Sequence, residues 1–206
     1  QEILSAIASQ EKLTPELEKA INAAEKMQAL EDLYLPYRPK RRTRAQIARE
    51  NGLEPLAQLI EEQGKALLPL EQLAAMHLDE EKGIVTVEDA WQGACDIVAE
   101  NISDSAEVRK LLRKELWNAG ELVSELIIDE KEAPEFLQYR DYSEPVRQLP
   151  PHRILAMNRG EDKKALKINL RCPDEKLIAK VAQKLNLKEQ SPFYTYYHNA
   201  LTDSYK

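Results

Sequence analysis

Apolar residues recur at three- and four-residue spacing through most of the first 118 residues, and this periodicity constrains the fold more than any other feature of the sequence. The clearest case begins at Thr86, where an acidic residue at Asp89 gives the form of a helix-capping box. One face of the helix that follows carries Val87, Ala90, Trp91, Ala94, Ile97, Val98 and Ile102. The pattern predicts a long, half-buried helix at the centre of an α-helical fold.

Further helix signals flank this segment on both sides. Thr14-Pro15-Glu16 combines a cap, a first-turn proline and a first-turn acid, and predicts a helix whose apolar stripe is Leu17, Ile21, Ala24, Met27 and Leu30. Shorter helices are expected over 43–50, 55–62 and 69–77, and Asp104 with Glu107 indicates the start of another. Pro36 and Pro39 interrupt the series and hold the segment between the first two helices extended.

The pattern changes after Gly120. Residues 122–128 fit either the end of a helix or a whole strand. Four prolines between 134 and 151 indicate a connection rich in loops. Apolar segments at 154–157 and 166–170 flank a polar turn and predict a β-hairpin, followed by a helix from Pro173. We therefore expect a mainly α fold, a multi-helical scaffold with helix-turn-helix-like hairpins and a small β-hairpin-containing C-terminal part. The expected domains are 1–145 and 146–206.

Several classes of protein are excluded by what the chain does not contain. Its longest apolar run, Ala66–Leu70, is far too short to cross a bilayer, and no secretory signal opens the sequence. Cys95 and Cys172 stand far apart, which favours a reducing compartment. We expect a cytoplasmic protein without membrane contact. The chain begins without Met, and we expect it to be a piece of a longer protein.

Catalytic and cofactor signals are also missing. The three histidines fall in different predicted elements, no Ser or Cys stands in a glycine-rich elbow, and the six glycines make no phosphate-binding loop. We expect no metal, no cofactor and no enzyme activity in this chain.

A basic island, which we define as residues 36–50, is the candidate functional site. It carries a net charge of +5, so the other 191 residues carry −12 of the chain's total of −7. Its candidate nucleic-acid-binding residues are Arg38, Lys40, Arg41, Arg42 and Arg44. These cations can neutralise phosphates, or they can pair with the chain's own carboxylates. Tyr34 and Tyr37 can likewise stack on bases or belong to the core, and we predict that both are largely buried.

The two helices expected over 43–50 and 55–62 allow two interpretations of their packing. Residues 43–62 have helix-turn-helix proportions, although a plain helical hairpin packed on the core fits the pattern better.

The segment from Leu30 to Arg44, LEDLYLPYRPKRRTR, resembles the signature of the Tex family of bacterial transcription accessory proteins. Other segments resemble the family in the same order, and they are 12–17, 47–50, 52–56, 90–100, 143–145, 151–153, 159–161 and 203–206. Residues 128–132 depart from the family pattern, in which a Lys-rich stretch precedes the Ser-Glu-Pro segment, and 139–143 is shortened.

This resemblance implies a helical scaffold from the N-terminal half of a multidomain protein. Members continue into an RNase H-like, YqgF-type domain, helix–hairpin–helix elements and an OB-fold that binds RNA. The resemblance also implies a non-catalytic function associated with nucleic acid, and we expect this piece alone to bind nucleic acid weakly. The alternative is a protein docking scaffold that contacts RNA polymerase or the protein's own C-terminal domains, and a third possibility is a nuclease carried by the RNase H-like domain.

Overall fold

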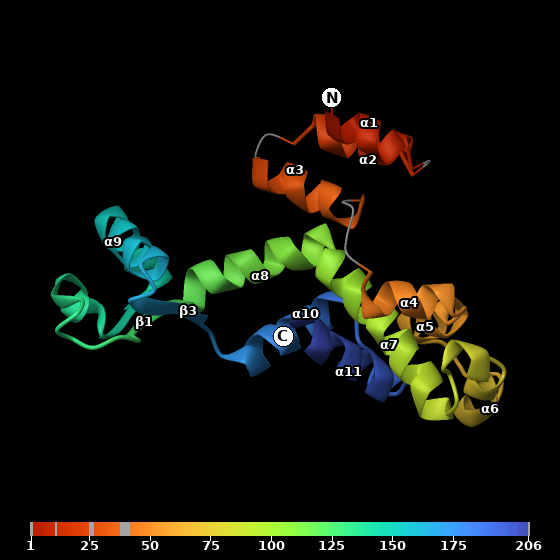
Figure 1. The fold of residues 1–206 in the computed structure, drawn as a ribbon. Coiled ribbons are helices and arrows are strands. Elements are labelled where there is room, and N and C mark those ends of the chain that lie inside the picture. Colours follow the sequence, from red (N-terminus) through yellow and green to blue (C-terminus); the bar gives the residue numbers. More distant parts are fainter. Residues whose placement is uncertain (1, 11, 25–26, 38–41, 206) are drawn as a thin grey trace. The chain divides into compact units, whose positions relative to one another are not determined.

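The computed structural model describes residues 2–10, 12–24, 27–37 and 42–205. Its elements confirm a mainly α fold with a small β-containing part (Figure 1). Contacts divide the chain into two compact units, one of Gln1–Arg109 with Ile178–Lys206 and one of Lys110–Leu177. This division differs from the domain boundary predicted at residue 145. The independent folding of residues 1–145 and 146–206 stays a prediction.

The first unit is built around α7 (Val87–Asp104), the long helix predicted from the apolar periodicity. Its capping box is confirmed, because the Thr86 hydroxyl accepts from the Asp89 N–H at 3.1 Å and the Asp89 carboxylate accepts from the Thr86 N–H at 2.8 Å. Burial of α7 along its length stabilises this unit, since buried apolar surface contributes about 25 cal/mol per Å². Helices α4 (Arg44–Glu50), α5 (Glu54–Glu62), α6 (Leu70–Ala75) and α11 (Tyr194–Tyr205) pack against it (Figure 1).

Helices α4 and α5 form a hairpin on α7. Gly52 has φ of +84°, a conformation that costs glycine little, and it turns the chain between the two helices. Leu53 follows it and is fully buried against α7 at Gly93, where a Cβ would lie 2.3 Å from the Leu53 Cδ1 atom. The hairpin is therefore fixed to the long helix at its turn.

The remaining elements of the first unit are short. They are α1 (Glu2–Ala8), α2 (Pro15–Asn22), α3 (Met27–Tyr34), η1 (Leu35–Tyr37) and η2 (Glu80–Lys82). Helix α8 (Ala106–Ala119) continues from this unit into the second, and α10 (Asp174–Lys184) returns from it.

The second unit contains an antiparallel sheet in the order β2-β1-β3, formed by β1 (Glu121–Leu126), β2 (Asp141–Pro145) and β3 (Leu166–Arg171). Helix α9 (Pro151–Asp162) and η3 (Pro134–Tyr139) cover one face, and η4 (Val146–Gln148) precedes α9. The core between them consists of Ala133, Phe136, Tyr139, Met157, Ala165 and Leu166.

Four expectations from the sequence are wrong in detail. The segment at Pro36, expected to be extended, forms the 3-10 helix η1 over Leu35–Tyr37. Residues 154–157 lie inside α9, so β3 pairs with β1 and not with a strand at 154–157. The single helix expected from Pro15 is two helices, α2 and α3, and Met27 at its predicted apolar stripe is exposed. Helix α8 begins at Ala106, where the Ser105 hydroxyl, rather than Asp104, accepts from the Val108 N–H.

The described helices include no segment that is both long enough and apolar enough to span a bilayer.

Candidate nucleic-acid interface

The basic island falls partly within the described residues. Arg38, Lys40 and Arg41 lie outside them, while Arg42 and Arg44 stand at the N-terminal end of α4 with side chains that are 66% and 70% exposed. The structure thus places two of the five predicted residues, one on each side of the α4 N-cap residue Thr43.

Both described cations make ion pairs with the chain's own carboxylates. The Arg42 guanidinium donates to Glu50 at 2.6 Å, and the Arg44 guanidinium donates to Asp203 of α11 at 2.8 Å with Asp96 of α7 at 3.7 Å. Pairs as exposed as these contribute only about 0–1 kcal/mol, because water solvates the separated charges nearly as well. Exchange of these partners for phosphate oxygens therefore costs little.

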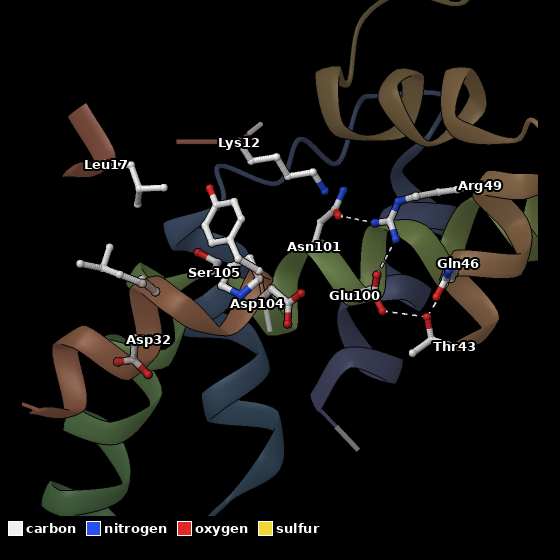
Figure 2. A pocket seen from close by; sticks show the side chains of 14 residues that line it. Lys12, Leu17, Asp32, Thr43, Gln46, Arg49, Glu100, Asn101, Asp104 and Ser105 are labelled. Atoms are coloured by element: carbon white, nitrogen blue, oxygen red, sulfur yellow. Dashed lines mark hydrogen bonds and ion pairs between the residues drawn. The ribbon is translucent and has the colours of Figure 1, made fainter. Parts of the chain in front are cut away.

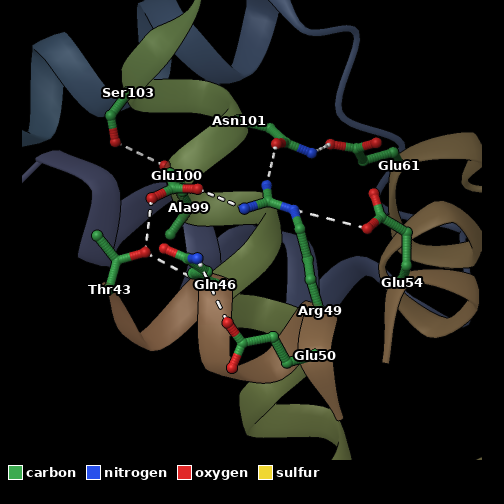
Figure 3. A network of polar contacts seen from close by, with 10 residues as sticks. All are labelled: Thr43, Gln46, Arg49, Glu50, Glu54, Glu61, Ala99, Glu100, Asn101 and Ser103. Atoms are coloured by element: carbon green, nitrogen blue, oxygen red, sulfur yellow. Dashed lines mark hydrogen bonds and ion pairs between the residues drawn. The ribbon is translucent and has the colours of Figure 1, made fainter. Parts of the chain in front are cut away.

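Thr43 anchors the middle of the island to α7. Its hydroxyl accepts from the Gln46 N–H at 3.1 Å and so caps α4, and the same hydroxyl donates to the Glu100 carboxylate at 2.9 Å (Figure 3). One side chain thus caps the start of α4 and ties that helix to α7.

Arg49 is the centre of a larger polar network (Figure 3). Its guanidinium donates to Glu100 in a short hydrogen bond and to the Asn101 side-chain oxygen at 2.8 Å, and it lies 3.6 Å from Glu54. The Asn101 amide in turn donates to Glu61 at 2.8 Å. The network joins α4, α5 and α7. The side chains of Arg49 and Glu100 are only 30% and 18% exposed, so this ion pair stabilises the packing of the three helices and is less available to a ligand than Arg42 or Arg44.

A cavity of about 720 Å³ lies beside this network in the first unit (Figure 2). Tyr37 and Thr43, which flank the undescribed part of the island, both line it, together with Arg49, Glu100 and Asn101. The cavity carries both signs of charge, so it does not select an anion by itself. Residues on both sides of the undescribed segment 38–41 therefore line one cavity.

Tyr34 and Tyr37 are half-buried, so the prediction that both are largely buried is met only in part. The Tyr37 carbonyl accepts from the Gln10 side chain at 2.7 Å, which holds the segment against the N-terminal helices. Neither tyrosine is fully enclosed.

The second helix of the α4–α5 hairpin has an acidic outer surface. Glu54 and Glu62 are exposed on α5, and Glu61 is half-buried beside them. A helix with this charge repels phosphates, so α5 is poorly suited to enter a DNA groove. Recognition of DNA by a helix-turn-helix stays a prediction.

A second polar cluster lies in the other unit, where Tyr142, Glu144 and Arg153 meet. The Tyr142 hydroxyl donates to Glu144 in a short hydrogen bond, and the Arg153 guanidinium donates to both groups at 2.7 Å. The hydrogen bond from Tyr142, followed by that from Arg153, lowers the pKa of Glu144 below its ordinary 4.5. Burial, followed by donation to the carboxylate, raises the pKa of Tyr142. The cluster joins β2 to α9.

Within the described ranges, no group of three or more His, Cys, Asp or Glu side chains is arranged to hold a metal ion. Sequence reasoning missed the network of Arg49, Glu100, Asn101 and Glu61. Its members are up to 52 residues apart, and the only local signal was that Arg49 lies on the same face of α4 as the buried Ala45 and Ala48.

Comparison with known proteins places this chain in a family. The sequence pattern described as Tex central region-like matches residues 66–202. The chain belongs to the Tex family. It is 46% identical over 169 residues to Protein tex of Bordetella pertussis, and 41% identical over 184 residues to Transcriptional accessory protein Tex of Neisseria gonorrhoeae.

A more distant Tex relative is S1 RNA-binding domain-containing protein 1 of Homo sapiens, at 31% identity over 180 residues. The three matches cover 82%, 88% and 83% of this chain but only 21%, 24% and 18% of the relatives. The chain thus spans about a fifth to a quarter of their length, and the family membership expected from its motifs is confirmed.

Proposed function

We propose that this chain is a non-catalytic scaffold within a Tex-type transcription accessory protein of the bacterial cytoplasm, and that its basic island binds nucleic-acid phosphates. The observation that carries the proposal is the pair of exposed guanidinium groups, Arg42 and Arg44, which flank the anchored Thr43 in a segment with net charge +5. Lys and Arg side chains gain affinity for nucleic acid by releasing condensed counterions from the phosphates.

The anchoring of the island supports this role. Thr43 and Arg49 tie the later part of the island to Glu100 of α7, and near its start the Tyr37 carbonyl accepts from the Gln10 side chain. A segment fixed at both ends loses less conformational entropy on binding than a free tail. The names of two relatives, a transcriptional accessory protein and an S1 RNA-binding domain-containing protein, agree with a partner of this class.

The proposed binding is weak and without sequence preference. The chain carries a net charge of −7, so a polyanion is repelled by most of its surface. Phosphate contacts carry no sequence information. Tight RNA binding then belongs to other domains of the whole protein.

A second candidate function is protein docking, with RNA polymerase or the protein's own C-terminal domains as the partner. The observation in its favour is that Arg42, Arg44 and Arg49 already pair with carboxylates, as they would with an acidic protein surface. Salt separates the two, because counterion release gives nucleic-acid binding a steeper dependence on salt than a protein contact has.

The test is fluorescence anisotropy with labelled single-stranded RNA, single-stranded DNA and duplex DNA of one sequence, about 30 nucleotides long, between about 50 and 200 mM salt. This chain and the whole protein are titrated side by side. We expect weak binding of the chain to every probe, lost as salt rises, and tighter binding by the whole protein. Absence of binding at the lowest salt, or equal affinity of chain and whole protein, would contradict the proposal.

A further inference from the structure

Strand β3 lies at one edge of the sheet in the second unit, because the strand order is β2-β1-β3. The Ile127 N–H donates to the Ala165 carbonyl at 2.9 Å, and this bond continues the register of β1 with β3. Hydrogen-bonded and non-bonded pairs alternate along an antiparallel ladder, so every second residue after Ala165 faces β1 with its backbone groups. These residues are Lys167, Asn169 and Arg171.

Ile168 and Leu170 turn their backbone N–H and C=O groups away from β1, towards the outer side of β3. Among the described residues, no group pairs with these backbone groups. The strand is open to solvent here, because Leu170 is 47% exposed and the residues on both sides of it are exposed as well. An edge with unpaired backbone groups is a template on which an extended segment can add as a further strand.

The charged side chains of the sheet change sign from one strand to the next. Arg171 of β3 lies opposite Glu121 of β1 in the register of the two strands. Lys167 lies opposite Glu125 in the same way, so all four side chains share one face of the sheet. Within the described sheet no strand follows β3, and both of its cations are exposed. A strand added at this edge would have these two cations as its cross-strand neighbours.

Charge decides which segment fits this edge. A second copy of β3 that paired antiparallel through the outward backbone groups would be centred on Asn169, and would place Lys167 opposite Arg171 of the other copy. Like charges directly opposite are destabilising, so the edge disfavours a second copy. Acidic side chains at alternate positions would meet the cations favourably. On the other face of the added strand, an apolar side chain would cover the exposed Leu170.

We propose that the edge of β3 binds an extended segment of a partner protein in which acidic and apolar residues alternate. The main chain of the segment pairs with Ile168 and Leu170, and its acidic side chains lie opposite Lys167 and Arg171. Its apolar side chains lie on the face of Leu170. The pairing requires a peptide main chain, which a nucleic acid lacks, so this site is independent of the function proposed for the basic island.

The test follows amide resonances and amide hydrogen exchange of the 206-residue chain by NMR while the peptide acetyl-EVEVE-amide is added. We expect saturable shifts along β3 and slower exchange of the Ile168 and Leu170 amides, because these N–H groups gain acceptors. One matched ligand carries Lys in place of each Glu, and a second is N-methylated at both Val residues, whose N–H groups would face β3. Each should bind at least about tenfold more weakly, which corresponds to about 1.4 kcal/mol.

Two protein variants complete the test. Leu170→Pro removes an outward N–H without breaking the ladder to β1, and should abolish binding. Lys167→Gln with Arg171→Gln should weaken binding several-fold, whereas Lys110→Gln with Lys114→Gln, an equal change of charge on α8, should leave the affinity within about twofold. The charge variant remains informative if Leu170→Pro unfolds the sheet. Unchanged exchange at β3, equal binding of the N-methylated peptide, or an unchanged affinity in the charge variant would overturn the proposal.

Discussion

Replacement of Leu53 by Ala tests the packing that positions the basic island. Leu53 is 0% exposed and fills the space above Gly93, so the change removes three carbon atoms from a closed core. At about 0.8 kcal/mol per carbon, the lost transfer free energy is about 2.4 kcal/mol, and the cavity raises the total to about 3 kcal/mol. For a domain of this size, that free energy lowers Tm by roughly 6–12 °C.

The assay is urea and thermal unfolding followed by Trp91 fluorescence in a Trp117→Phe background, because Trp91 is buried in the same unit as Leu53. Leu67→Ala is the matched control, since Leu67 is 94% exposed and the same change there is expected to cost less than about 0.5 kcal/mol. A decrease in the free energy of unfolding below about 1 kcal/mol in Leu53→Ala, or equal decreases in the two variants, would refute the packing of the α4–α5 hairpin on α7.

Three further changes probe other contacts. Gly160→Ala should destabilise the second unit by about 1–3 kcal/mol, because its Cβ would lie 2.5 Å from the Leu166 Cδ1 atom. Gly64→Ala is the control, since a Cβ there meets nothing within 4 Å. Hydrogen exchange of the β1 and β3 amides compares the two variants, and equal protection would show the reasoning to be wrong. Thr86→Ala should cost about 1 kcal/mol in chemical denaturation through loss of the α7 cap, and Thr86→Ser should restore most of it; a neutral Ala variant argues against the cap. Glu144 has a lowered pKa, so its contribution to stability is present above about pH 4.5 and is lost as pH falls through its pKa in the folded protein. Glu144→Gln should therefore flatten the pH dependence of amide hydrogen exchange in β2, and an unaltered pH profile would contradict this.

The elements that could be predicted from the sequence are those whose signals are local. Thr86 and Asp89 lie three residues apart, and so the capping box of α7 was evident before any contact was known. Asn51-Gly52 marks the turn of the helical hairpin for the same reason, since its geometry depends on one glycine.

Helix α9 could not be predicted in the same way. The apolar run Ile154–Met157 is too short to distinguish a helix from a strand, and the polar residues with Gly160 after it resemble a turn. Gly160 lies inside α9, and Leu166 and Phe136 pack in the space that a side chain at this position would occupy. That packing depends on the tertiary fold, which overrides local propensity.

Only part of the candidate site could be predicted from the sequence. The cluster of cations is visible in the sequence, but their partners are not, since Arg44 and Asp203 are 159 residues apart. The same holds for the network of Arg49 and Glu100 and for the stacking of Trp91 on Tyr196. Charge composition indicates where a polyanion can bind, and only the fold shows which carboxylates compete for the same cations.

The central claim is that the basic island contacts phosphates. The most direct test is the slope of log K against log salt for the double variant Arg41→Gln with Arg42→Gln in the whole protein, compared with Lys110→Gln with Lys114→Gln on the exposed side of α8. The account predicts that the slope flattens by about one unit for each lost phosphate contact, that affinity falls about equally for all sequences, and that Tm hardly changes. An unchanged slope together with a lowered Tm would contradict it and assign the island to internal ion pairs.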